Sequence, residues 1–101
     1  MKRIFTVLLL VATILLGGCE TIPVQQMSDA RQAYRAAQEA GADKYVPELF
    51  NEVTVLMNDA DHFLAEGRYG LAGKIAERAR VLAIKARKKA LTLRGATAIQ
   101  R

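Results

Sequence analysis

The sequence predicts an all-α fold, in which a short helix precedes an antiparallel helical hairpin and a separate apolar helix stands at the N-terminus. Three stretches after residue 26 carry apolar residues every three or four positions, which is the spacing of one helix face. Glycines fall at the ends of these stretches, where helices commonly stop. The chain after residue 18 has no run of alternating apolar and polar residues that would predict a strand.

The first eighteen residues are predicted to be a cleaved export signal. Lys2 and Arg3 precede an almost unbroken apolar run from Ile4 to Leu16, and two glycines and Cys19 follow. A basic start, a short apolar run and small residues before a cut are typical of such signals. The segment Leu16-Gly17-Gly18-Cys19 resembles the lipobox of bacterial lipoproteins. That resemblance implies cleavage before Cys19, a diacylglycerol on its sulfur and an acylated amino group, with no other cofactor.

Two other interpretations of this segment stay open. The apolar run could be an uncleaved membrane anchor, although a spanning helix needs about 20 apolar residues. Cys19 could also be an ordinary buried thiol; it is the only cysteine, so no intrachain disulfide is possible. Lipidation gives a firm anchor, because each buried CH₂ contributes about 0.8 kcal/mol and two or more chains hold stably.

Glu20 stands at the position that sorts lipoproteins in Gram-negative bacteria. Aspartate there usually signals retention at the inner membrane, so the resemblance implies that Glu20 permits transport to the outer membrane. We therefore expect a lipid-anchored envelope protein on the periplasmic face of the outer membrane. The 83 residues from Cys19 onward hold 13 basic and 10 acidic residues, and this modest net charge of about +3 does not favour nucleic-acid binding.

Residues 19–27 are predicted to be the lipidated cysteine and a tether, and residues 28–95 a single helical domain. Ser28 or Asp29 is the expected N-cap of the first helix, with Gln32 at capping-box spacing from Asp29. Gly41 is its expected end. The apolar positions of this alanine-rich helix are Met27, Ala30, Ala33, Tyr34 and Ala37.

The second helix is expected to begin at Pro47, because a proline at the first helical position loses no hydrogen bond. A short turn from Gly67 to Gly70 makes the third helix, from about Leu71, its antiparallel neighbour. Gly95 is the expected stop, and residues 96–101 are expected to fray. The apolar positions are Leu49, Val53, Leu56, Met57, Ala60, Phe63 and Leu64 in the second helix, and Ala72, Ile75, Ala76, Ala79, Leu82, Ala83, Ala86, Ala90 and Leu93 in the third.

Charge is divided unevenly along the chain. Residues 19–67 hold three basic residues against nine acidic ones, whereas residues 68–101 hold ten basic residues against Glu77 alone. One interpretation is that the acidic flank of the second helix faces the basic flank of the third. The other is that the basic face binds anionic lipid, lipopolysaccharide or peptidoglycan acids.

A second resemblance covers residues 28–93. The run from Ala37 to Leu49, with its Tyr45-Val46-Pro47-Glu48-Leu49 start, and the later Gly67-Arg68-Tyr69-Gly70-Leu71-Ala72 are similar to a family of short helical bacterial lipoproteins. That family is a domain of unknown function, which some members carry ahead of an OmpA-like peptidoglycan-binding domain. The resemblance implies an envelope lipoprotein and brings no activity or site residues. The same turn looks like one tetratricopeptide hairpin without its Trp and Leu-Gly positions.

The residues do not predict an enzyme or a metal site. His62 is the only histidine and Ser28 the only serine, so neither a histidine cluster nor a serine triad can be assembled. Asp59 and Asp61 lie near His62 in sequence, but residues one and two apart on a helix do not face each other. The three tyrosines are expected to be packing residues.

A candidate partner surface lies on the third helix, away from its alanine stripe. It consists of Val81, Ile84 and Leu91 set among Lys74, Lys85 and Lys88. Incidental exposure and cover by the first helix are the alternatives, since scattered surface apolar residues are ordinary. The favoured function is a non-enzymatic structural or adaptor role, with another envelope protein or a second copy as partner. The alternative is a binding module for peptidoglycan or lipopolysaccharide.

Overall fold

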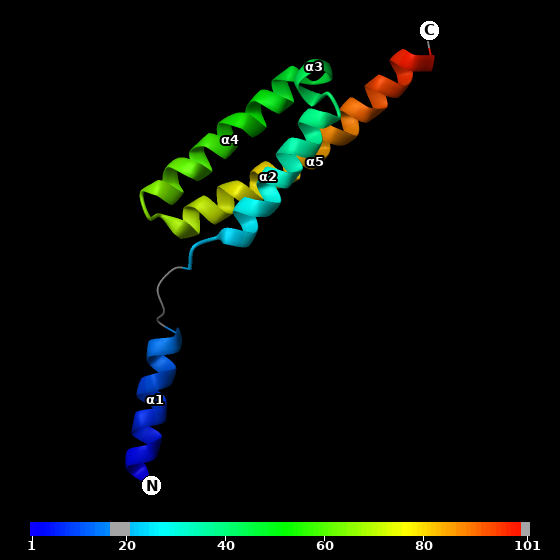
Figure 1. Ribbon diagram of the computed structural model, residues 1–101. Coiled ribbons are helices and arrows are strands. Elements are labelled where there is room, and N and C mark those ends of the chain that lie inside the picture. Colours follow the sequence, from blue (N-terminus) through cyan, green and yellow to red (C-terminus); the bar gives the residue numbers. More distant parts are fainter. Residues whose placement is uncertain (17–20, 100–101) are drawn as a thin grey trace.

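The computed structural model describes residues 1–16 and 21–99, which form five helices and no strand (Figure 1). This confirms the predicted all-α class. The helices are α1 (Lys2–Leu16), α2 (Val24–Glu39), α3 (Ala42–Tyr45), α4 (Pro47–Ala65) and α5 (Tyr69–Ile99). Cys19 and Glu20, the predicted lipidation and sorting residues, lie outside the described residues.

Helix α1 stands apart from the core. Among the described residues it contacts none of the other four helices, and its large apolar side chains, such as Phe5 and Leu9, are exposed. A search of the described helices finds none with the length and apolarity needed to cross a membrane.

Helix α2 begins at Val24, so the predicted tether, which reached residue 27, is too long. Pro23 is the N-cap, and its carbonyl accepts a hydrogen bond from the amide of Met27 at 3.0 Å. Pro23 is buried beside Gly73 of α5, where an added Cβ would lie 3.1 Å from the Cβ of Pro23. Packing against α5 therefore sets the start of α2, and the polar residues Ser28 and Asp29 fall inside the helix instead of capping it.

The connector after α2 contains a short helix, α3, that the sequence did not predict. It begins after Gly41, whose φ of 89° is a left-handed conformation that suits glycine. Helix α4 then begins at Pro47, as predicted, and the loop between α4 and α5 turns at Gly67 with φ 77°.

Helix α5 starts two residues earlier than predicted and continues past Gly95 to Ile99. The predicted stop at Gly95 is therefore wrong, and the tail that was predicted to fray is helical as far as residue 99. Gly95 has no positive φ. A glycine in a helix interior costs only about 1 kcal/mol relative to alanine, so it ends a helix only where the chain also turns.

The core lies where α2 and α4 pack on α5 (Figure 1). Six α5 alanines are fully buried at alternating spacings of four and three, the 3.5-residue repeat of helices that pack with interlocking side chains. These residues, called the alanine seam below, are Ala72, Ala76, Ala79, Ala83, Ala86 and Ala90. Helix α2 runs parallel to α5, since Pro23 lies beside Gly73 and Arg94 donates to the carbonyl of Ala40 at 3.3 Å. Helix α4 runs antiparallel to both.

The buried face of α4 is turned from the predicted one. Phe50, Val53, Met57 and Ala60 are buried, whereas Leu49, Leu56 and Phe63 are only half-buried. The reason is α2: the Phe50 ring stacks on Tyr34 with centroids 4.9 Å apart, so α4 must cover α2 as well as α5. Leu93 was predicted to be buried but is 43% exposed, because it lies one turn beyond Lys89, where α4 begins alongside α5.

Candidate functional site

One candidate surface is the edge between α5 and α2. A hollow of about 500 Å³ lies there, and Ile84 contributes its apolar wall. Ile84 is 36% exposed, less than Val81 at 52%. The lining residues are Asp29, Gln32, Ala33, Ala36, Arg80, Ile84 and Arg87. Helix α2 therefore covers part of the predicted apolar strip, as one of the open alternatives had it.

An ion pair stands next to this edge. Arg80 donates from Nη2 to Oε1 of Glu77 at 2.5 Å and from Nε to both carboxylate oxygens at 3.2 Å. The hydrogen bonds from Arg80 lower the pKa of the Glu77 carboxyl, and the same contact raises the pKa of Arg80. Both groups are solvent-exposed, so water screens the attraction and the pair orients Arg80 more than it stabilises the fold.

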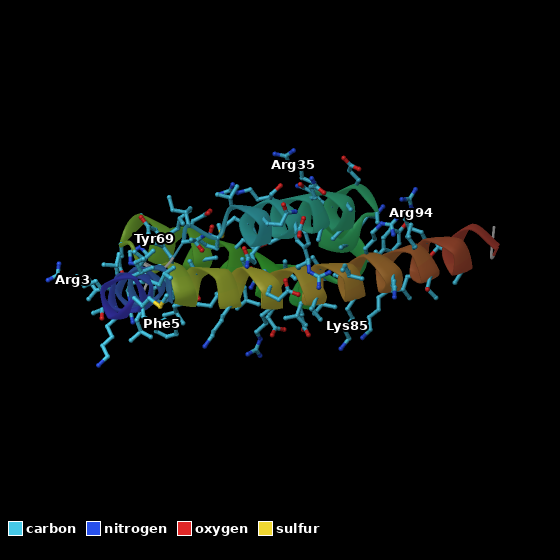
Figure 2. The ribbon with its side chains drawn as sticks, turned by 90° about the horizontal axis from the view of Figure 1, so that it is seen from below. Arg3, Phe5, Arg35, Tyr69, Lys85 and Arg94 are labelled. Atoms are coloured by element: carbon cyan, nitrogen blue, oxygen red, sulfur yellow. The ribbon has the colours of Figure 1, made fainter. Side chains whose placement is uncertain are left out.

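A second surface lies on the far side of α5. Arg80 and Arg87 mark the side facing α2, and a residue two positions away points about 200° around the helix, nearly the opposite way. That places Arg78 and Lys85 away from α2, and Figure 2 shows Lys85 projecting from the side of α5 opposite α2. The exposed residues of this side repeat at four, three, four and three: Lys74, Arg78, Val81, Lys85 and Lys88. We call them the basic stripe.

The predicted partner surface thus extends over two neighbouring rows of α5. Val81 lies in the basic stripe with the three predicted lysines. Ile84 lies at the α2 edge, and Leu91, seven residues later, continues its row and is exposed. All three aliphatic side chains reach solvent, and Val81 and Ile84, three residues apart, are neighbours on the surface of α5.

Helix α4 carries a matching row that the sequence reasoning missed. Tyr34 of α2 bonds to Thr54 at 3.0 Å, and Arg31 of α2 pairs with Asp61 at 3.1 Å. Glu52 and Asp59, two positions before these α2-facing residues, therefore point away from α2. The exposed row, the acidic stripe below, is Glu48, Glu52, Val55, Asp59 and His62. Its spacing of four, three, four and three is the same as that of the basic stripe. This repeated spacing is a signal in the sequence that could have revealed the row.

The two stripes are not joined by ion pairs within the chain. In the described part of the protein the pairs are Arg31–Asp61, His62–Glu66, Arg68–Glu66 and Glu77–Arg80, and none links α4 to α5. The expectation that acidic and basic flanks pair across these helices is therefore wrong at the level of direct contacts. Both stripes keep exposed charge.

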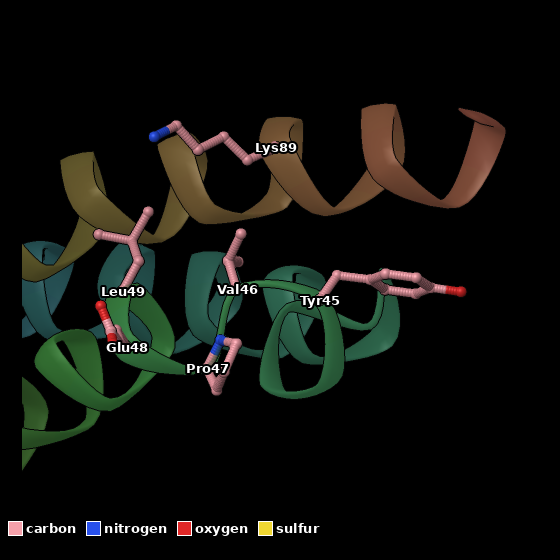
Figure 3. A pocket seen from close by; sticks show the side chains of 6 residues that line it. All are labelled: Tyr45, Val46, Pro47, Glu48, Leu49 and Lys89. Carbon is pink, nitrogen blue, oxygen red and sulfur yellow. The ribbon is translucent and has the colours of Figure 1, made fainter. Parts of the chain in front are cut away.

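A hollow of about 400 Å³ lies between the start of α4 and α5, at Lys89 (Figure 3). Lys89 extends from α5 above Leu49, while Val46 and Pro47 form the floor from the other side. Tyr45 also lines the hollow, and the Lys44 ammonium lies 5.6 Å from the centroid of its ring. The hollow brings Glu48 and Lys89 to one site, so opposite charges border it.

The chemistry of the described residues is limited. No three of their His, Cys, Asp and Glu side chains are grouped so as to hold a metal ion. His62 is exposed, with Nε2 2.9 Å from Oε1 of Glu66. Tyr34 packs on Phe50 and Tyr45 packs against the core, as expected of packing residues.

The described helices, with their exposed stripes, define a small all-α domain. Residues 25–101 match the family described as Domain of unknown function (DUF4398), and the chain belongs to that family. This confirms the resemblance to a domain of unknown function. Comparison with curated proteins and with solved structures found no match.

Proposed function

We propose that the protein is a lipoprotein of the bacterial envelope, anchored by lipid on Cys19 at the periplasmic face of the outer membrane, with a non-enzymatic adaptor role toward another envelope protein. The observation that carries the anchor is the segment Leu16-Gly17-Gly18-Cys19, which begins at the last residue of the apolar helix α1. Glu20, next to the anchor, permits outer-membrane sorting.

The independence of α1 supports this proposal. Since α1 contacts none of the other helices described, cleavage before Cys19 would remove no core contact. Helix α2 begins at Val24, only five residues after Cys19. Five residues span at most about 18 Å when fully extended, so the domain would stand close to the lipid surface.

Metabolic labelling with a radioactive fatty acid tests the anchor. We expect label on the parent and none on Cys19→Ser, while Gly17→Ala, which keeps a small residue before the cut, should stay labelled. In a Gram-negative host, Glu20→Asp should move the protein to the inner-membrane fraction. Label retained on Cys19→Ser would refute the lipoprotein assignment.

The adaptor contact is assigned to the α2–α5 edge, where Ile84 and Leu91 are aliphatic anchors and Arg80 and Arg87 form a charged border. A few buried aliphatic or aromatic side chains usually carry most of the binding energy of an interface. A photoreactive residue at Ile84 of the full lipoprotein should cross-link one envelope protein in stoichiometric amount. The same residue at Arg35, on the exposed side of α2, is the matched control; equal capture at both positions would refute this contact.

The alternative function, binding of peptidoglycan or lipopolysaccharide, is supported by the exposed basic stripe. Binding that depends on Lys85 and Lys88 should weaken steeply as salt screens the charges. Pelleting with purified sacculi, and with lipopolysaccharide, would compare the parent with Lys85→Glu/Lys88→Glu. Arg35→Glu/Lys44→Glu gives the same change of charge elsewhere. Equal losses for the two variants would show a general charge effect and exclude a defined site.

A further inference from the structure

The acidic and basic stripes border the same side of the protein. On α4 and on α5 alike, the residues that contact α2 lie about 200° from charged residues of the stripe. Between the stripes lie the half-buried apolar residues Leu56, Phe63, Ile75 and Leu82, of which all but Phe63 are packed against the core cluster. This side therefore presents a partly apolar strip with acid along one margin and base along the other. We call it the α4–α5 face.

We propose that the α4–α5 face binds a second copy of the same chain, with α4 of each copy lying on α5 of the other. A twofold axis that runs parallel to the helices and lies in the plane of contact brings this about. It places the acidic stripe of each copy against the basic stripe of the other. One interface therefore has two seams, and in each seam acidic residues face basic ones. The surface is self-complementary, as a closed twofold dimer requires.

The register of the charges fits this symmetry. Rotation about an axis parallel to the helices leaves the position of every residue along that axis unchanged. Within one copy, Leu49 of α4 and Lys89 of α5 line the same hollow, so they stand at the same position along the axis. Counted from there toward the Gly67 loop, Glu52 is three residues along and Lys85 four, while Asp59 is ten and Arg78 eleven. One residue is about 1.5 Å of helix, so Glu52 meets Lys85, and Asp59 meets Arg78, of the second copy. Val55 and Val81 meet between them.

The other twofold arrangement is disfavoured. An axis perpendicular to the helices would lay α4 on α4 and α5 on α5, so that like charges would face each other along both seams. The parallel axis also leaves both N-termini at the same end of the dimer. If Cys19 is lipidated as proposed above, both anchors then enter one membrane; the dimer itself does not depend on that anchor.

Charge reversal tests the proposal with the full chain in detergent micelles, with mass measured by analytical ultracentrifugation. Glu52→Lys/Asp59→Lys puts positive charge opposite Arg78 and Lys85 of the second copy, and Arg78→Glu/Lys85→Glu puts negative charge opposite its Glu52 and Asp59. We expect the parent to dimerise and each variant alone to have its dimer dissociation constant raised by more than about tenfold, because the seams become repulsive. An equimolar mixture of the two variants, and one chain with all four changes, should recover the dimer. Glu39→Lys/Asp43→Lys changes two exposed acids elsewhere and should leave dimerisation intact.

Cross-linking identifies the contact directly. A carbodiimide should join Glu52 to Lys85, and mixing ¹⁴N-labelled with ¹⁵N-labelled chains shows whether the joined peptides come from two copies. Mixed-isotope peptides that disappear above about 0.5 M salt, where screening is strong, are the expected result. Circular dichroism of each variant checks that the helices are retained.

A monomeric parent, or variants that stay monomeric when mixed, would overturn the proposal. So would sacculus binding that is lost with Arg78→Glu/Lys85→Glu while neither variant changes the mass, since the basic stripe would then serve a polymer. A parent protein that takes up no fatty-acid label but still dimerises would refute the anchor and leave this inference standing.

Discussion

Replacement of Ala83 by leucine tests the close approach of the helices along the alanine seam. Ala83 is fully buried at the middle of the seam, with Ala79 and Ala86 equally buried beside it. Leucine adds three carbon atoms where the side chain has no exposed surface, and such overpacking typically costs about 1–3 kcal/mol. In a domain of this size each 1 kcal/mol lowers the Tm by about 4–8 °C. We therefore expect Ala83→Leu to lower the Tm by about 5–20 °C.

Thermal unfolding followed by circular dichroism at 222 nm measures this effect on the full chain. Ala96→Leu is the matched control, since it makes the same change on the same helix at an exposed position. Its Tm should move by no more than about 2 °C, in line with ordinary surface substitutions. An Ala83→Leu protein that melts with the parent, or above it, would refute the close approach of α2 and α4 to α5.

Three further outcomes follow from the core, the turns and the exposed ion pair. Val53→Asp buries an unpaired carboxylate at a fully buried position, so we expect several kcal/mol of destabilisation; a urea midpoint near that of the parent would contradict the packing of α4. Gly41→Ala and Gly67→Ala each place a side chain at positive φ, which costs about 1–2 kcal/mol. Gly41→Ala should cost more, because its Cβ would meet the ring of Tyr45 at 3.0 Å. Equal urea midpoints for the two variants would argue against this contact. The Glu77 carboxyl should titrate below its ordinary pKa when followed by NMR. The stabilisation from its hydrogen bonds with Arg80 is therefore present at neutral pH and lost as the pH falls through that lowered value. Arg80→Ala should return the pKa to normal, and an unchanged titration would exclude the pair.

Local sequence signals predicted the helices well where the chain must turn. Pro47 begins α4 because its missing amide costs nothing there. Gly67 turns the chain because its φ of 77° is easy only for glycine. Gly95 looked the same in sequence but stays helical, because nothing in the fold makes the chain turn there. A glycine alone therefore does not distinguish an end from a continuing helix.

Tertiary contacts decided what the sequence could not. The first helix was expected to be marginal by itself, yet α2 packs along α5, and the contact of Pro23 with Gly73 sets its start. The period of α4 was clear, but its rotation depended on Phe50 meeting Tyr34, which lies sixteen residues earlier in the chain. A hydrophobic period predicts that a helix has a buried face. Which of the adjacent apolar residues at the margin of that face are fully buried depends on the partner helix.

The same dependence placed the candidate surfaces. The sequence correctly selected Val81, Ile84 and Leu91 as exposed on α5. A helical wheel does not include α2, which lies beside Ile84 and covers part of its row. The acidic row on α4 was overlooked because attention stayed on α5, although its spacing equals that of the basic row.

The central position of α5 has a consequence for the order in which the protein folds. Helices α2 and α4 meet each other through a few side chains around Tyr34 and Arg31, whereas each buries its apolar row on α5. Of the described helices, α5 is the last to be synthesised, so α2 and α4 have no complete core to fold into before it appears. The α4–α5 contact closes a short loop and the α2–α5 contact a long one, and short closures lose less entropy. The nascent chain should therefore stay open until α5 is made, after which α4 docks first and α2 completes the domain.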